Sequence, residues 1–297
     1  MRTLLLIGCA FALTVLAGCT DPPDMEELGR RIEQVVASEP EAVVAVSIRE
    51  PERGLALDMQ GARLYHAAST MKVPVMIEVF RQTDVGTVNP NDSLLIENRF
   101  RSIVDGSAFA IGDDSDDEIY QHLGSRMAIL DLVESMITVS SNLATNILID
   151  FVGAEAVQAT SERLGTTQMK TLRGVEDLKA FEQGLSNRTT SSDLATLMLA
   201  LLDGRAVNPE ADAQMLDILT RQQFNEMIPA GLPAGTRIAH KTGQITAIHH
   251  DTAVVFPATG SPYVLVILIE GIADDTISAA LGARVAQTVD HFLSASP

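Results

Sequence analysis

Ser69 and Lys72 are the first pair of residues whose types and spacing could support nucleophilic catalysis. They are three positions apart, so on a helix both side chains would lie on one face. Pro74 is best tolerated in a first helical turn, which predicts a helix beginning near Thr70 with Ser69 at its N-terminus. There the helix dipole and the Lys72 ammonium would favour a Ser69 alkoxide, and a neutral Lys72 could accept the hydroxyl proton.

The same spacing also suits a purely structural arrangement. Serine is a common N-cap residue and lysine is usually solvated, so this pair alone is weak evidence for a hydrolase. Two later segments add to it. Residues 140–142 read Ser-Ser-Asn at the start of a predicted helix, and residues 241–243 read Lys-Thr-Gly at the end of a predicted strand. The three segments together could supply a nucleophile, a base, a proton donor and a cation.

In this order and at this wide spacing, the three segments resemble the motifs of class A β-lactamases and penicillin-binding proteins. The resemblance covers about residues 41–293. It implies that Ser69 is the nucleophile, that Lys72 activates it, and that Ser140 passes a proton to the leaving nitrogen. It also implies a set of substrate-binding residues: Asn142, Lys241, Thr242, Gly243 and Gln244.

The resemblance further implies an oxyanion hole formed by the backbone N–H groups of Ser69 and Gln244. The implied substrate is a small-molecule β-lactam or a cell-wall peptide, cleaved through an acyl-enzyme without a cofactor or a metal. The acidic run at residues 113–118 lacks the spacing and the glycine of an EF-hand loop, so we expect no calcium site there.

Several positions depart from the class A pattern. Residue Ser141 replaces the usual Asp, at a position that we expect to be structural. Glu176 lies about where the family carries the glutamate that holds the deacylating water, but Ala180 replaces the Asn usual four residues later. Glu182 is a second candidate, followed at the equivalent distance by Ser186. If neither glutamate holds that water, the acyl-enzyme would persist.

No arginine closely follows the Lys-Thr-Gly segment to assist in binding a substrate carboxylate. His249 and His250 could replace it, although a histidine satisfied in the core or exposed to solvent is the more common case. Three functions therefore stay open: a class A-like β-lactamase, a D-alanyl-D-alanine peptidase or esterase, and a non-catalytic envelope-binding lipoprotein.

The N-terminus has the pattern of a lipoprotein signal peptide over residues 1–18. Arg2 precedes an apolar run over residues 4–16 that is too short to span a bilayer as a helix. Residues 16–19 read Leu-Ala-Gly-Cys and resemble a bacterial lipobox, which implies cleavage before Cys19 and lipidation of its thiol. Residues 19–24 would form a tether. The sequence thus predicts an exported, periplasmic protein attached to the membrane by a lipid.

Apolar patterns predict an α/β (α+β) fold in which both chain ends build one antiparallel sheet of about five strands. The resemblance described above implies that this is the β-lactamase/DD-peptidase-like fold. Residues 25–66 and 231–297 would form the α/β domain, and residues 67–230 an inserted all-helical domain with an Ω-like loop. Within that insertion, a capping box at residues 115–118 predicts a helix that ends before Gly124.

Composition agrees with a globular protein that binds no nucleic acid. Apolar residues make up 46 % of the 297 residues, enough for a large core. The net charge of −18 would repel a polyanion, and a chain with 4 % aromatic residues and no tryptophan offers few stacking platforms. We expect a monomer.

Overall fold

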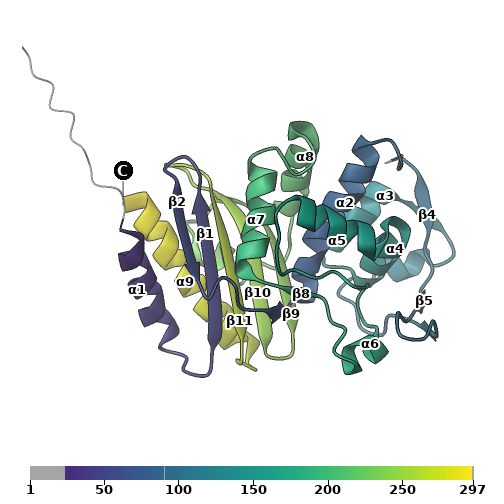
Figure 1. The fold of residues 1–297 in the computed structure, drawn as a ribbon, viewed down its shortest axis with the longest axis horizontal. Coiled ribbons are helices and arrows are strands. Elements are labelled where there is room, and N and C mark those ends of the chain that lie inside the picture. Colours follow the sequence, from purple (N-terminus) through teal and green to yellow (C-terminus); the bar gives the residue numbers. More distant parts are fainter. Residues whose placement is uncertain (1–23, 90, 296–297) are drawn as a thin grey trace, which may run out of the picture.

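The computed structural model describes residues 24–89 and 91–295. Its centre is an antiparallel five-stranded sheet with the strand order β2-β1-β11-β10-β9, drawn in Figure 1. Two strands come from the start of the chain and three from its end: β1 (Val43–Glu50), β2 (Leu55–Met59), β9 (Arg237–Ile245), β10 (Ile248–Phe256) and β11 (Tyr263–Glu270). The predicted sheet built from both chain ends is therefore confirmed.

Helices cover both faces of this sheet. On one face, α1 (Met25–Val36) and α9 (Asp275–Ala295) lie side by side and bury apolar side chains of alternating strand residues. On the other face, α7 (Ser191–Leu202) packs against β1, β10 and β11. The strands are apolar on both sides because both sides are covered.

The segment between β2 and β9 holds the remaining helices: α2 (Lys72–Asp84), α3 (Ile129–Thr138), α4 (Asn142–Val152), α5 (Ala154–Arg163), α6 (Leu178–Glu182) and α8 (Pro209–Leu219). The sequence predicted an all-helical insertion, but this segment also contains short strands. Three short antiparallel pairs join its loops: β3 (Tyr65–His66) with β8 (Arg188–Thr189), β4 (Ser93–Leu95) with β7 (Arg126–Ala128), and β5 (Phe100–Arg101) with β6 (Ala108–Phe109).

The helix predicted after Ser115 does not form, and a single 3-10 turn, Ile119–His122, takes its place. Ser115, the expected cap, donates from its hydroxyl to the backbone carbonyl of Val139 instead. Asp116 accepts from the backbone N–H of Ile119 in the 3-10 turn and also from the distant Ser135 hydroxyl. Asp114, just before the predicted box, reaches the start of α4. Long-range contacts have thus overridden the local capping pattern.

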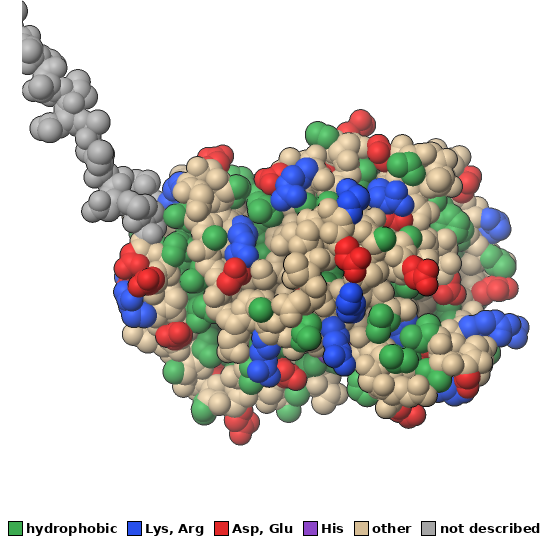
Figure 2. Space-filling view, in the orientation of Figure 1, with side chains coloured by type: hydrophobic (Ala, Val, Ile, Leu, Met, Phe, Trp, Pro, Cys, Tyr) green, Lys and Arg blue, Asp and Glu red, His purple; other side chains and the backbone are tan. Residues whose placement is uncertain are grey.

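The expected signal peptide and Cys19 lie outside the described residues. The description begins at Asp24, whose carboxylate caps α1 by accepting from the N–H groups of Glu26 and Glu27. Across residues 24–89 and 91–295, none of the helices combines the length and apolarity needed to cross a bilayer. Acidic and basic side chains are interspersed over the face drawn in Figure 2.

Candidate active site

Ser69 lies in a 3-10 turn, Ala68–Met71, that runs directly into α2. The nucleophile predicted from the sequence thus stands at a helix N-terminus. Its side chain is half-buried, and Ala68 before it has a φ of 44°, in the left-handed region that non-glycine residues rarely adopt. The backbone of Ala68 is held there because its N–H donates to Nδ1 of His66 at 3.0 Å.

Gly243 allows strand β9 to pass directly against this turn. A Cβ atom at Gly243 would lie 2.9 Å from the backbone nitrogen of Ser69 and 3.0 Å from that of Thr70. Only glycine permits so close an approach without a backbone shift. The predicted Lys-Thr-Gly segment lies inside β9 and not at its end, since the strand continues to Ile245.

Lys72 is fully buried in the first turn of α2. Its ammonium donates to the backbone carbonyl of Ser140 at 2.5 Å, to the Ser140 hydroxyl at 3.0 Å and to Oδ1 of Asn142 at 2.9 Å. Burial lowers the pKa of Lys72 from 10.5 to about 7, although the charges of Asp114 and Glu176 oppose that shift. Close to neutral pH, Lys72 can therefore exist as an amine that accepts a proton.

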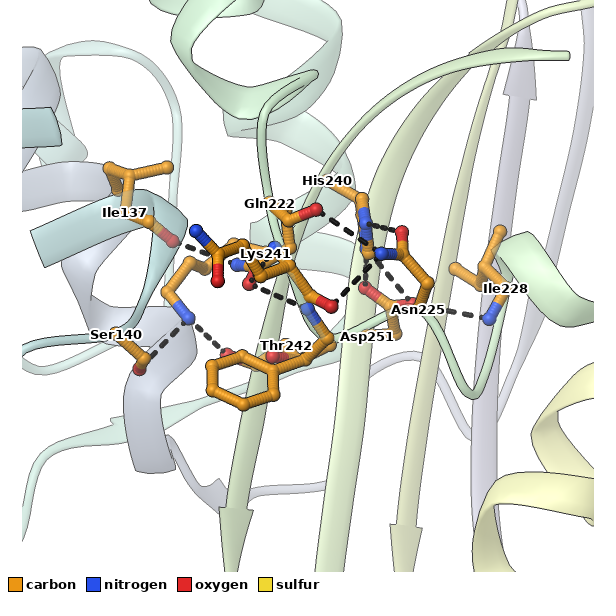
Figure 3. Close-up of polar contacts among 11 residues, drawn as sticks. Ile137, Ser140, Gln222, Asn225, Ile228, His240, Lys241, Thr242 and Asp251 are labelled. Atoms are coloured by element: carbon orange, nitrogen blue, oxygen red, sulfur yellow. Dashed lines mark hydrogen bonds and ion pairs between the residues drawn. The ribbon is translucent and has the colours of Figure 1, made fainter. Parts of the chain in front are cut away.

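The hydroxyl of Ser140 connects the two lysines of the site. Lys241, also fully buried, donates to this hydroxyl at 3.0 Å and to the backbone carbonyl of Thr242 at 2.9 Å (Figure 3). Burial, followed by the charge of Lys72, lowers the pKa of Lys241 well below its usual value. Because the two ammonium groups disfavour each other, loss of a proton from Lys72 favours the charged form of Lys241.

Ser140 itself has a φ of 60°, a conformation that non-glycine residues rarely adopt, and both its carbonyl and its hydroxyl accept from Lys72. Ser141 caps α4 by accepting from the N–H of Ala144, which agrees with the structural role expected for this position. The carboxylate of Asp114 accepts from the N–H groups of Asn142 and Leu143, each at 2.8 Å. The sequence does not mark Asp114 as a site residue, because the acidic run at residues 113–118 has no calcium-loop pattern and the predicted helix start begins only at Ser115.

Glu176 points into the site from the segment before α6. One carboxylate oxygen accepts from Nδ2 of Asn142 at 3.2 Å, and the other from the N–H of Gly112 at 2.8 Å. Its φ is 60°, and the neighbouring Asp177 anchors the segment by accepting from the Ser102 hydroxyl at 2.9 Å. The alternative candidate, Glu182, is exposed at the end of α6 and lines neither cavity beside Ser69.

Two cavities open beside Ser69. One, of about 280 Å³, is lined by Ser140, Asn142, Phe224, Thr242, Gln244 and Asp113–Ser115. The other, of about 570 Å³, extends along the segment that carries Glu176, and its apolar lining includes Val175, Leu178, Phe181 and Ile245. Asp113, Asn142 and Gln244 line both cavities, so the two are parts of one cleft on either side of the nucleophile.

The two histidines considered as carboxylate ligands do not reach this cleft. Both are buried in β10. His250 donates from Nε2 to the backbone carbonyl of His66 and accepts at Nδ1 from the N–H of Ile269. Burial lowers the pKa of His250 to about 4, so it is neutral and structural. Burial likewise lowers the pKa of His249.

Comparisons with known proteins agree with this geometry. The family model described as the beta-lactamase enzyme family matches residues 27–292. A β-lactamase from Rhodobacter capsulatus is 25 % identical over 272 residues, which cover 91 % of this chain and 87 % of the relative. The structure of PBP-A is similar with a TM-score of 0.81 and 29 % identity, covering 93 % of this chain and 99 % of that one.

A second solved structure is a point mutant of PBP-A, described as an acyl-enzyme complex with penicillin G. Its TM-score is 0.80 at 28 % identity, over 93 % of this chain and 99 % of the other. The match of the family model over nearly the whole described chain and the similarity of the fold agree, and the chain belongs to the beta-lactamase enzyme family.

Proposed function

We propose that the chain hydrolyses β-lactams through an acyl-enzyme on Ser69. One observation carries the proposal: the Ser140 hydroxyl accepts from both buried lysines at 3.0 Å, within the cleft that Ser69 lines. A hydroxyl between two such groups can relay a proton to a leaving nitrogen, and the cation of Lys241 can hold the substrate carboxylate.

In the acylation step, Oγ of Ser69 attacks the carbonyl carbon of the β-lactam and the C–N bond of the ring breaks. Neutral Lys72 takes the proton of the serine hydroxyl, and Ser140 passes a proton to the departing nitrogen. The backbone N–H groups of Ser69 and Gln244 are the proposed oxyanion hole. The placement of Gly243 against the nitrogen of Ser69 supports this assignment, because it brings the next residue of β9 beside the same turn.

In the deacylation step, a water attacks the ester carbonyl, the bond to Oγ breaks, and Ser69 regains its proton. We assign Glu176 as the base that takes the proton of this water. Its carboxylate accepts from Nδ2 of Asn142, and the ammonium of Lys72 donates to Oδ1 of the same side chain. The three groups therefore form one hydrogen-bonded chain at the cleft.

A second candidate is an enzyme that acylates but releases its product slowly, as a cell-wall peptidase would with a β-lactam. Ala180 favours this candidate, because it offers no side-chain amide to hold a water together with Glu176. The similarity to PBP-A supports it equally.

Mass spectrometry of the chain mixed with penicillin G tests both candidates. We expect an adduct on Ser69 that forms and then disappears, together with hydrolysed penicillin. A lasting adduct would favour the second candidate. The Ser69→Ala variant should form no adduct, and one that forms on this variant would refute the assignment of the nucleophile.

We also propose that the protein is exported and anchored through a lipid on Cys19. The lipobox at residues 16–19 supports this proposal. Expression of the full chain in a bacterium should place it in the membrane fraction, and Cys19→Ala should move it to the soluble fraction. Equal partition of the two proteins would contradict lipid anchoring.

A further inference from the structure

A buried histidine–aspartate pair lies on the face of the sheet opposite to Lys241 and takes no part in the proposed chemistry. His240 is 1 % exposed, and Asp251 is fully buried. Nδ1 of His240 lies 3.0 Å from Oδ1 of Asp251. Because neighbouring residues of a strand point to opposite faces, Lys241 turns toward Ser140 and His240 turns away from it (Figure 3).

The second ring nitrogen of His240 meets the side chain of Asn225, with 3.3 Å between Nε2 and Oδ1. The orientation of this amide is set by its Nδ2, which donates to the backbone carbonyls of Gln222 and Gln223 at 3.3 and 3.0 Å. Oδ1 therefore faces the ring and can only accept. Both ring nitrogens of His240 thus face oxygen atoms, Nδ1 that of Asp251 and Nε2 that of Asn225, so the ring bridges the sheet and the segment that carries Asn225.

The same pair ties residues 222–228, here called the edge segment, to the sheet at two points. One is Asn225, through His240 on β9. The other is Ile228, whose backbone N–H donates to Oδ2 of Asp251 on β10 at 3.2 Å. Asp251 is the acidic residue in contact with the ring of His240. Lys241 lies on the other face of the strand, and Glu226 on the edge segment is exposed.

Phe224 is the residue of the edge segment that reaches the cleft, where it lines the same cavity as Ser69 and Ser140. It directly precedes Asn225. We infer that His240 and Asp251 are positioning residues that fix the edge segment and thereby hold Phe224 as a wall of the substrate cavity. The inference rests on the proposed function, since it assumes that this cavity binds the β-lactam.

Steady-state kinetics with nitrocefin tests the inference on His240→Asn, Asn225→Ala and the double variant. Each single change removes the hydrogen bond between the His240 ring and the edge segment, so we expect KM to rise roughly tenfold while kcat stays within about twofold. The KM of the double variant should be no higher than that of the single variants, because both substitutions remove the same hydrogen bond between His240 and Asn225. Gln223→Ala, on an exposed side chain of the same segment, should leave KM unchanged.

An unchanged KM, a fall in kcat alone, or multiplicative effects in the double variant would overturn the inference. If His240→Asn does not fold, Asn225→Ala carries the test, because Asn225 is exposed and its replacement leaves the His240–Asp251 pair in place.

Nitrogen-15 NMR of histidine-labelled protein tests the contact between His240 and the edge segment without any substrate. The His240 ring signals, assigned by their absence from His240→Asn, should shift in Asn225→Ala and keep their positions in Gln223→Ala. Unchanged signals in Asn225→Ala would overturn the inference. This measurement separates the two hypotheses, since a chain that never reacts with nitrocefin or penicillin would refute the proposed function, whereas the contact of His240 is decided independently.

Discussion

The ammonium of Lys72 donates to Ser140 twice, to its backbone carbonyl at 2.5 Å and to its hydroxyl at 3.0 Å. The proposed base and the proposed proton donor are therefore in direct contact, and a proton taken by one could leave through the other without crossing solvent. The backbone contact depends on the left-handed conformation of Ser140. Strain at this residue is thus part of the catalytic arrangement.

The acylation rate should rise with pH around a midpoint of about 7. Neutral Lys72 is the active base, and burial lowers its pKa to about 7, so the rate falls below this pH and reaches a plateau above it. Rapid-mixing mass spectrometry of the adduct at several pH values measures the effect. In Asp114→Asn, which removes a charge that raises the pKa of Lys72, the midpoint should move to lower pH. A rate that falls as pH increases through 7 would contradict the role of Lys72.

Glu176→Gln should separate acylation from deacylation. The adduct should form at close to the normal rate, because Glu176 makes no hydrogen bond to Ser69 or Lys72. Its release should slow by roughly 100-fold or more, the usual contribution of a general base. Adduct lifetime is the measurement. Glu182→Gln, a change at the exposed end of α6, is the matched control and should leave the lifetime unaltered. Normal turnover by Glu176→Gln would remove Glu176 from the mechanism.

Gly243→Ala should impair acylation strongly. The added Cβ would lie 2.9 Å from the backbone nitrogen of Ser69, and a backbone atom cannot move aside as a flexible side chain can. A displacement of the nucleophile of this order typically costs about 100-fold in rate. Gly29→Ala in α1 is the control, since its Cβ would meet only a side-chain methyl of Leu57 at 3.8 Å and should leave activity intact. Full activity in Gly243→Ala would mean that β9 does not constrain the nucleophile.

Asp113 should make the cleft selective for the charge of the substrate side chain. Its carboxylate is exposed, lines both cavities beside Ser69, and makes no ion pair among the residues that the structure describes. Ampicillin, with an ammonium group, should therefore be preferred over carbenicillin, with a carboxylate. Asp113→Asn should reduce the ratio of their kcat/KM values by about fivefold, as expected for an exposed charge interaction of ~1 kcal/mol. An unchanged ratio would show that the side chains do not approach Asp113.

The sheet and the three sequence segments could be predicted because they depend on local signals. Apolar runs separated by turns marked the strands, and the type and spacing of Ser69 and Lys72 marked a helix start. The lengths of β9 and β10 could not be predicted. Both strands continue through polar residues such as Thr242 and Asp251, which look like strand ends in the sequence. The buried carboxylate of Asp251 finds its partners on Ile228 and His240, which only the folded chain brings beside it, so the sequence pattern of a buried strand is broken at this residue.

The supporting residues of the site were missed for the same reason. Asp114 binds the start of α4 at Asn142, which is 28 positions later in the chain. His240 on β9 binds Asp251 on the neighbouring strand β10. Neither relationship has a local spacing that marks it. Acidic residues in a row are ordinarily solvated, and a single histidine in a strand has no defined partner until the register is known.

The strand order has a consequence for biosynthesis. The first strand of the chain, β1, pairs with the last, β11, and Lys241 reaches the cleft only as part of the edge strand β9, which joins through β10. In a chain still emerging from a ribosome or a translocation pore, β9 can pair with β10, but this hairpin has no link to β1 until β11, which ends at residue 270, has passed. We therefore expect the protein to stay inactive until it is almost completely delivered, and a truncation before that residue to leave the nucleophile pocket unformed.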